Sequence, residues 1–251
     1  SAGWRRYFLF STLNGFSFGL LAENVVVLYA LKAGVPGHIA GILVAFMFLS
    51  LPFMLLGKRL MRRIGAARTQ ATAWTARNLC ALIMACAPFL ALTGGNTFVV
   101  WTIVVCAFGF YACRAVGIIA FRPLMGEITT ASDYGRFMGG MGLRFNGSYF
   151  VALVLFALVI KFSPARHMFQ TLIGLGCVTG LASAAVVAGI PETVGPRDSA
   201  RQPILQSIAK LWRNRSQRKL IFAQMAGWGG FTMIVPFSVV ALKAVYGVSE
   251  F

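Results

Sequence analysis

Charged side chains inside long apolar stretches are the first candidates for chemistry in this sequence. They are Glu23, Arg77, Arg114 and Arg144. An ionised group inside a bilayer costs at least ~2.5 kcal/mol, so it normally faces protein or water. Glu23 could bind a proton or a cationic solute, or it could pair with an arginine. Arg114 could hold an anionic group through two hydrogen bonds, or it could pair with Glu23 and respond to its protonation.

The other two arginines have a simpler interpretation beside the functional one. Arg77, like Arg144, lies roughly seven or eight residues from the end of its apolar stretch, so its side chain could extend to the membrane surface. We favour that interpretation for Arg77. Arg144 shares a helix face with Gly140, Gly147 and Ser148, and it stays a candidate for the site.

Two stripes of polar residues could line a binding cavity. On a continuous helix, at about 100° per residue, Asn14, Ser17 and Asn24 lie within about 80° of one another, whereas Glu23 lies about 180° from Asn14. We therefore expect the asparagine and serine stripe to face the cavity and Glu23 to face elsewhere.

The second stripe lies near the C-terminus and repeats every four residues, at Gln224, Trp228 and Thr232. An aromatic ring between two hydrogen-bonding side chains suits a sugar or another polar solute. The alternative is packing against neighbouring helices.

The composition places all of these residues in a membrane protein. The chain has 251 residues, 58% hydrophobic and 12% charged, and a net charge of +17. A soluble domain carries about twice that charged fraction. The excess of basic residues could indicate nucleic-acid binding or basic cytoplasmic loops. Because these residues cluster between long uncharged runs, we expect no nucleic-acid partner. The five cysteines lie in apolar runs without metal-type spacing, so we expect no metal and no cofactor.

About twenty apolar residues cross a bilayer as a helix, and seven such stretches are found. They cover residues 7–31, 37–56, 70–92, 98–120, 138–160, 167–190 and 219–241. With the N-terminus in the cytoplasm, sixteen of the 23 basic residues lie on the cytoplasmic side and four outside. This bias follows the positive-inside rule. It predicts a multi-pass protein of the cell (inner) membrane with a cytoplasmic N-terminus.

The connections divide the chain into three parts. Residues 1–190 form a predicted bundle of six helices, 191–218 a basic cytoplasmic segment with an amphipathic helix over 203–213, and 219–251 a seventh helix. The first and seventh spans share the sequence Ala-Leu-Lys-Ala, at 30–33 and again at 241–244. Repeats of a six-helix unit would produce this pattern.

This all-α, polytopic organisation resembles the major facilitator superfamily of secondary transporters. The sequence GKRLMRRIGAAR at 57–68 is similar to that family's loop between spans two and three, G-x-x-x-D-R-x-G-R-R. Arg63 and Gly65 match the family's arginine and second glycine. Gly57 lies one residue early, Arg68 lies one residue late, and Arg62 stands in place of the acid. On the fourth span, Arg114 with Gly117 is similar to the family's R-x-x-x-G, one residue short.

The resemblance implies the N-terminal six-helix domain and the first helix of a second domain, in a truncated chain. It implies alternating access around a central site that the first and fourth helices of each half contact. The expected function is transport of a small polar or anionic solute by a monomeric, non-enzymatic membrane protein, coupled to protons or another ion. Two alternatives stay open. One is a seven-helix sensory or retinal-type protein, which would need a lysine midway along its last helix. The other is an intramembrane enzyme, which needs clustered acids, histidines or a nucleophile with its base.

The charge bias makes a prediction about topology. Reporter fusions in a bacterial inner membrane, joined after Arg68 or after Asn96, should behave oppositely. A fluorescent protein should mature at Arg68, on the cytoplasmic side, and alkaline phosphatase should be active at Asn96, on the outer side. Phosphatase activity at Arg68 would overturn the predicted orientation.

Overall fold

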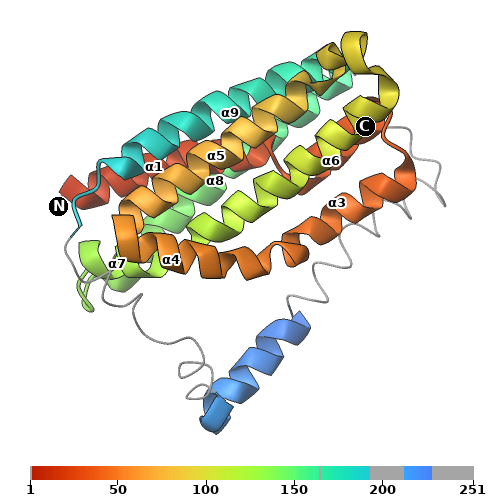
Figure 1. Cartoon of the computed structure of the whole chain (residues 1–251). Helices are drawn as coiled ribbons and strands as arrows, with labels where there is room; N and C mark the ends of the chain where they lie inside the picture. Colours follow the sequence, from red (N-terminus) through yellow and green to blue (C-terminus); the bar gives the residue numbers. More distant parts are fainter. Residues whose placement is uncertain (1, 164, 193–211, 228–251) are drawn as a thin grey trace. The chain divides into compact units, whose positions relative to one another are not determined.

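A computed structural model describes residues 2–163, 165–192 and 212–227 of the chain. Within these ranges the secondary structure is helical throughout (Figure 1). The elements are α1 (Ala2–Leu20), α2 (Glu23–Lys32), α3 (Gly37–Leu49), η1 (Leu51–Phe53), α4 (Met54–Ile64), α5 (Ala66–Cys86), η2 (Ala87–Leu90), α6 (Ala91–Ile118), α7 (Phe121–Ile128), α8 (Tyr134–Phe162) and α9 (Arg166–Ala188).

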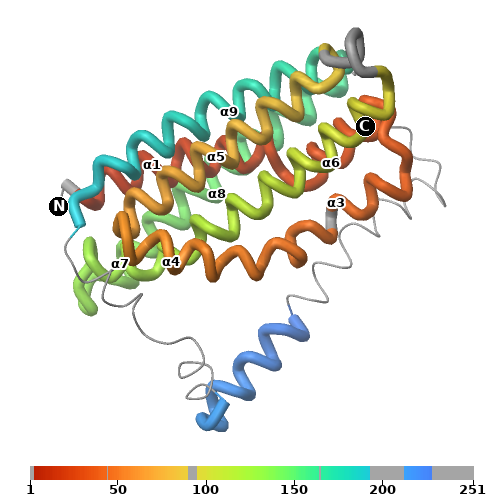
Figure 2. Tube along the Cα trace, in the orientation of Figure 1, coloured from red at the N-terminus to blue at the C-terminus, as the bar shows by residue number. Residues whose placement is uncertain are grey.

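Five helical stretches are long and apolar enough to cross a membrane, and they make the chain a multi-pass membrane protein. They are Gly3–Lys32, Gly37–Ile64, Gly95–Ile128, Tyr134–Phe162 and Arg166–Ala188. The predicted third span, 70–92, corresponds to α5 and η2, and it is not one of the five. Polar residues of α5 lower the hydropathy of this span. Four of them, Thr69, Gln70, Arg77 and Asn78, are buried inside the protein and do not face lipid. Helix α5 packs between α6 and α9 (Figure 2).

The first predicted span is not one continuous helix. Helix α1 ends at Leu20, and Ala22 has an extended backbone with ψ 153° before α2 begins at Glu23. The break lies within the apolar stretch, where Leu20 and Leu21 are buried. Non-helical backbone at membrane depth is tolerated where protein covers it or where it lines a cavity.

Short 3-10 turns that contain a proline interrupt the second and third predicted spans. Pro52 lies in η1, and Pro88 lies in η2. Beyond η1 the second span continues as α4 to Ile64, past its predicted end at 56. The break predicted at 93–97 reduces to one residue, Gly95, whose φ of 72° requires the left-handed region that glycine tolerates.

The spans pack in a pattern that relates their first and second halves. Helix α1, the first span, packs against the fifth (α8) and sixth (α9), whereas α6, the fourth, packs against the second (α3 and α4) and third (α5). Exchanging spans one to three for spans four to six leaves this pattern unchanged. The contacts are therefore symmetric between the first three spans and the last three.

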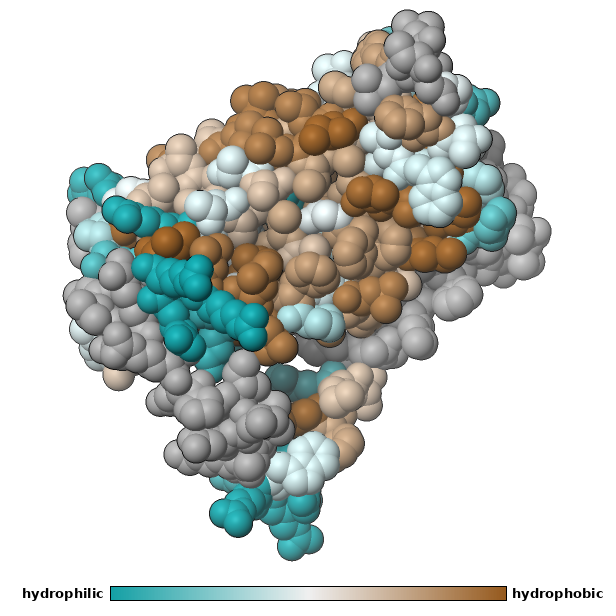
Figure 3. All heavy atoms as spheres, viewed as in Figure 1, coloured by the Kyte–Doolittle hydropathy of each residue, from teal (hydrophilic) through white to brown (hydrophobic). Residues whose placement is uncertain are grey.

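Apolar side chains cover the middle of the bundle, and hydrophilic ones gather near its end at α4 (Figure 3). The basic residues Arg59, Arg62 and Arg63 are exposed there. Exposed leucines and phenylalanines such as Leu143 and Phe150 lie along α8. This is the surface of a helix bundle that meets lipid or another apolar partner.

Residues 201–251 form a separate unit, of which the structure describes residues 212–227. Residues 215–227 are helical. Asn214 precedes this helix, and its side-chain oxygen accepts hydrogen bonds from the backbone N–H groups of Ser216 and Gln217, as an N-cap does. The predicted amphipathic helix and the seventh span beyond residue 227 lie outside the described residues.

Close packing of α1 on α8 predicts opposite effects for two glycine substitutions. A Cβ at Gly15 would collide with the backbone carbonyl of Phe145, whereas nothing lies within 4 Å of a Cβ at Gly142. Gly15→Ala should lower stability by roughly 1–3 kcal/mol, and Gly142→Ala should be neutral or stabilising by up to ~1 kcal/mol. Thermal unfolding in detergent measures both, and equal melting temperatures would contradict this packing.

Candidate functional site

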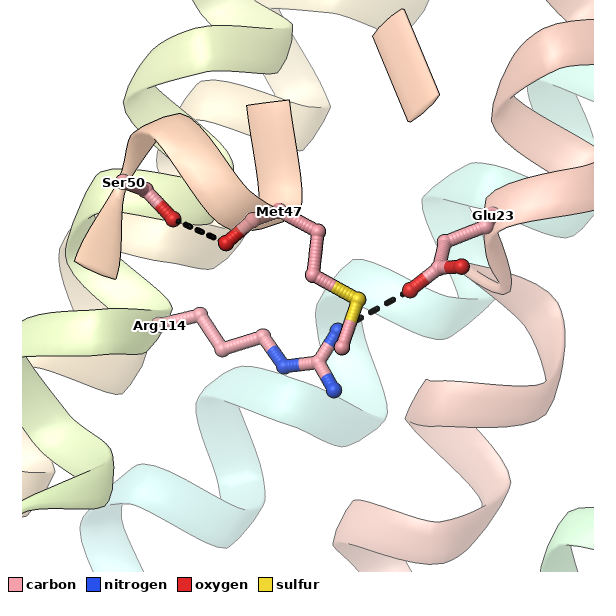
Figure 4. Close-up of polar contacts among 4 residues, drawn as sticks. All are labelled: Glu23, Met47, Ser50 and Arg114. Atoms are coloured by element: carbon pink, nitrogen blue, oxygen red, sulfur yellow. Dashed lines mark hydrogen bonds and ion pairs between the residues drawn. The ribbon is translucent and has the colours of Figure 1, made fainter. Parts of the chain in front are cut away.

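An ion pair joins the two halves of the bundle. The Nη1 atom of Arg114, on α6, lies 3.4 Å from Oε1 of Glu23, the first residue of α2 (Figure 4). A carboxylate in the first turn of a helix interacts favourably with the helix dipole. The side chains are partly exposed, at 23% for Arg114 and 32% for Glu23. The pair is therefore held by the fold and still reachable from outside.

The pairing of Glu23 with Arg114, one of the two roles considered from the sequence, is present, but sequence reasoning missed the helix break that brings the two side chains together. The angle of about 180° between Asn14 and Glu23 assumed one continuous helix, but the backbone turns out of the helix at Ala22. Glu23 consequently reaches Arg114 on α6. Arg114 in turn lines the same cavity as Asn14.

Helix α3 contributes a third group beside this pair. The Met47 side chain points toward the Arg114 guanidinium, as Figure 4 shows. The Ser50 hydroxyl donates a hydrogen bond of 3.0 Å to the Met47 backbone carbonyl, directly before η1. A polarizable thioether can adapt to a charged neighbour that changes position.

A cavity of about 300 Å³ lies between α1, α5, α6, α7 and α8. It is lined mostly by aromatic rings, with a few polar groups and a single charged side chain, a composition typical of small-molecule sites. The lining residues are Tyr7, Phe10, Ser11, Asn14, Phe18, Gln70, Trp74, Arg114, Ile118, Phe121, Met141 and Phe145.

One wall of the cavity is fixed by a buried hydrogen bond. The Trp74 indole N–H donates to the Asn14 side-chain oxygen at 2.6 Å. Asn14 is 5% exposed and Trp74 4%. Because a buried indole N–H needs a partner, Asn14 holds the ring of α5 against α1. Asn14 therefore lines the cavity, and its contact with a solute stays a prediction.

Arg77 is wholly buried, so the interpretation that it extends to the membrane surface is wrong. Its guanidinium carbon lies 4.4 Å from the ring centroid of Phe18, 5.0 Å from that of Trp74 and 5.2 Å from that of Phe110. Nη2 lies 3.4 Å from the Ser17 hydroxyl, and Nε and Nη1 have no hydrogen-bond partner among the described residues. The aromatic faces stabilise the cation.

Phe18 connects the two arginines. The Arg114 guanidinium carbon lies 5.0 Å from the centroid of the same ring that Arg77 approaches. A sequence signal for Arg77 existed, since Gln70, Trp74 and Arg77 follow the i, i+4, i+7 spacing of one helix face. Sequence reasoning missed this stripe, so it did not identify Gln70 as a cavity residue. It also missed Tyr7, which lines the cavity from α1.

The remaining predicted site residues lie elsewhere. Ser17 is buried against Arg77 and is not among the lining residues, and Asn24 is exposed. Arg144 is exposed on α8, where it donates to the Gly140 carbonyl at 3.0 Å and lies 4.2 Å from the Phe8 ring centroid. It does not reach the cavity. Gln224 belongs to the separate C-terminal unit, and Trp228 and Thr232 lie outside the described residues.

The predicted conformational loop is largely helical. Gly57 and Arg63 belong to α4, and Gly57 is buried where a Cβ would meet the Val116 carbonyl of α6. Gly65 ends α4 with a φ of 91°. Arg63 and Arg68 are exposed.

A residue that sequence reasoning missed ties this region to the end of α9. The Glu192 carboxylate accepts a 2.8 Å hydrogen bond from the Ala67 backbone N–H at the start of α5. A Cβ at Gly65 would collide with that carboxylate. Arg6 of α1 also donates to the Gly189 carbonyl. The chain after α9 is thus anchored to both α1 and α5.

Comparisons with models of known protein families, with curated proteins and with solved structures find no match. Across the described residues, no group of three or more His, Cys, Asp or Glu side chains could hold a metal ion.

The Asn14–Trp74 hydrogen bond makes a prediction about stability. Asn14→Leu leaves the indole N–H buried without an acceptor, which should cost about 1–3 kcal/mol. Ser11→Ala is the matched control, because the Ser11 hydroxyl bonds within its own helix, to the Tyr7 carbonyl. Thermal unfolding followed by tryptophan fluorescence should show a clearly lower melting temperature for Asn14→Leu and only a small change in melting temperature for Ser11→Ala. A fall of equal size in both variants would remove Asn14 from this role.

Proposed function

We propose that this chain belongs to a secondary active transporter that moves a small polar or anionic solute by alternating access. The observation that supports this most directly is a solute-sized cavity with a cationic side chain, Arg114, whose ion-pair partner begins a broken helix. Discontinuous helices recur at the sites of secondary transporters, because their ends offer backbone groups and freedom to move.

The arrangement of helices supports the same proposal. The first and fourth spans, α1 and α6, both line the cavity, and each packs against two helices of the other half. Inverted three-helix repeats with the site at their interface are a common plan of transporters. This is also what the resemblance to the major facilitator superfamily implies.

The ion pair supplies a mechanism for coupling. Protonation of Glu23 removes the charge that attracts Arg114, and the freed guanidinium can then hold an anionic group of the solute. Loss of the proton restores the pair and expels the anion. Proton binding and solute binding would in this way be coupled. The helix break lies directly before Glu23, which also forms the ion pair. Helix α2 can therefore tilt relative to α1 when the ion pair opens.

Alternating access adds the expectation that the end of the bundle near Gly65 opens and closes. Glu192 caps α5 through Ala67, and Arg6 holds Gly189. These contacts keep the first, third and sixth spans together as one body. This body of three spans would then move relative to α3, α4 and α8.

Arg114→Ala in the natural full-length protein should abolish uptake while leaving membrane insertion intact. The lost charge-assisted hydrogen bonds are worth about 1.5–3 kcal/mol, or roughly 10- to 100-fold in apparent affinity. Uptake of radiolabelled organic acids, amino acids and sugars, each offered separately to proteoliposomes, measures the effect. Arg144→Ala is the matched control and should keep its activity. Unchanged transport kinetics in Arg114→Ala would remove Arg114 from the site, and no uptake of any of these solutes would contradict the transport proposal.

Glu23→Gln tests the coupling. It should abolish uphill, proton-driven accumulation but preserve exchange of solute across the membrane, because the glutamine cannot release a proton. Isotope counterflow with and without a pH gradient separates the two activities. Accumulation by Glu23→Gln that still responds to the pH gradient would exclude Glu23 as the coupling group.

A further inference from the structure

The cavity is elongated, and its two ends differ in chemistry. Tyr7 and Phe18 both line it and are eleven residues apart on α1, which corresponds to about 16 Å along a helix. Arg114 lies beside Phe18. Gln70 lies on the first turns of α5, four residues before Trp74. One end is therefore cationic, and the other carries neutral polar groups.

The neutral end contains unused hydrogen-bonding capacity. The Tyr7 hydroxyl and the Gln70 side-chain oxygen are buried, and neither has a hydrogen-bond partner within the described part of the chain. Both residues line the cavity. A buried polar atom without a partner is costly, so such atoms normally meet a ligand or an ordered water. The Gln70 oxygen can only accept, while the hydroxyl of Tyr7, whose side chain interacts with that of Gln70, can both donate and accept. A hydroxyl or N–H of the ligand would complete the hydrogen bonding at this end.

The wall between the two ends is apolar and largely aromatic. Phe10, Trp74, Ile118 and Phe145 line this section. Ser11 and Asn14 also line it, but the Ser11 hydroxyl already donates to the Tyr7 carbonyl and the Asn14 oxygen already accepts from the Trp74 indole. The Trp74 ring is held in place by Asn14. Flat rings offer a large contact area to a planar or apolar body, so a fully hydroxylated sugar would leave much of its polar surface unpaired here.

The charge balance around Phe18 favours a negative ligand. Glu23 is paired with Arg114, whereas Arg77 is wholly buried, and its contacts are three aromatic rings and the Ser17 hydroxyl. Two cations thus lie next to one ring and share one carboxylate, whose charge is lost when Glu23 takes up a proton. A monoanion bound at Arg114 then replaces the lost negative charge, while a cationic ligand would be repelled by both arginines.

Resting on the transport function proposed above, we infer that the solute is an elongated organic monoanion with a flat apolar body. Its carboxylate binds Arg114, its body lies against the aromatic wall, and a hydroxyl or N–H at its far end donates to the Gln70 oxygen. Arg77 does not touch the ligand, and it acts through Phe18 as a positioning residue that strengthens the preference for anions.

A set of matched probes tests this assignment on the natural full-length protein in nanodiscs. The parent probe is 3-(4-hydroxyphenyl)propionate. Its relatives lack the hydroxyl (3-phenylpropionate), lack the charge (3-(4-hydroxyphenyl)propan-1-ol) or reverse the charge (tyramine). Calorimetry measures binding, and thermal stabilisation of the unmodified protein gives a second readout that needs no variant. The parent should bind best, loss of the hydroxyl should weaken binding roughly threefold, and loss of the carboxylate at least tenfold.

Two variants should each remove one preference. Arg114→Gln should abolish the preference for propionate over propanol, and Gln70→Leu should abolish the preference for the hydroxylated probe while keeping the anion preference. Arg77→Gln should reduce the anion preference without changing the hydroxyl preference, which a merely structural role would not produce. Arg144→Gln, outside the cavity, is the matched control and should bind as the unmodified protein does.

The outcomes separate this inference from the proposed function. Preferred binding of the neutral or cationic probe, or no stabilisation by either anionic probe at millimolar concentration, overturns the inference. If the probes give either of these results but the protein transports a neutral sugar, the inference fails and the transport proposal still holds. Binding of the anions in the expected order, without transport of any solute, would keep the site and overturn transport. Equal binding of the two propionates would mean that water satisfies Gln70, and it would overturn the hydroxyl assignment.

Discussion

The rest of this structure depends on how a helix bundle in a membrane covers its buried cations. Arg77 and Arg114 can lie in the bundle because aromatic rings, a serine and one carboxylate surround them. Because lipid offers no such groups, α5 must have protein on both flanks, and it packs between α6 and α9. The order of the helices, the burial of the polar face of α5 and the position of the cavity all satisfy this one requirement.

The same requirement connects the broken first span to the candidate site. A continuous helix would direct Glu23 away from the face that carries Asn14, and Arg114 would then lack its carboxylate. The break at Ala22 redirects the chain, so that Glu23 starts a new helix and meets Arg114 from α6. The cost of irregular backbone is limited because Leu20 and Leu21 are buried. The local irregularity thus supplies the counter-charge that the bundle needs.

Hydropathy was sufficient to predict an all-helical membrane protein, and the interruptions of the second and third spans lie at Pro52 and Pro88, as the chemistry of proline explains. Asn14 and Arg114 were also recognised as cavity residues from their types and positions. Arg77 was misjudged because a one-dimensional pattern gives its distance from the helix end but not its neighbours. The helix break before Glu23 was missed because no proline or glycine occupies it at Ala22. Gln70 and Tyr7 were missed because neither residue type is unusual, and only the packing of α1 and α5 with α6, α7 and α8 places them at a cavity.

The burial of Arg77 also has a consequence for how the chain enters the membrane during synthesis. Helix α5 leaves the ribosome before α6 and α9, which later cover it. At that moment its arginine, glutamine and asparagine would face lipid, and the segment alone is a poor substrate for the insertion machinery. Stable integration of α5 must therefore await the emergence of α6. The third and fourth spans would then partition from the translocon as a hairpin, with the turn at Gly95 allowing them to fold back on each other.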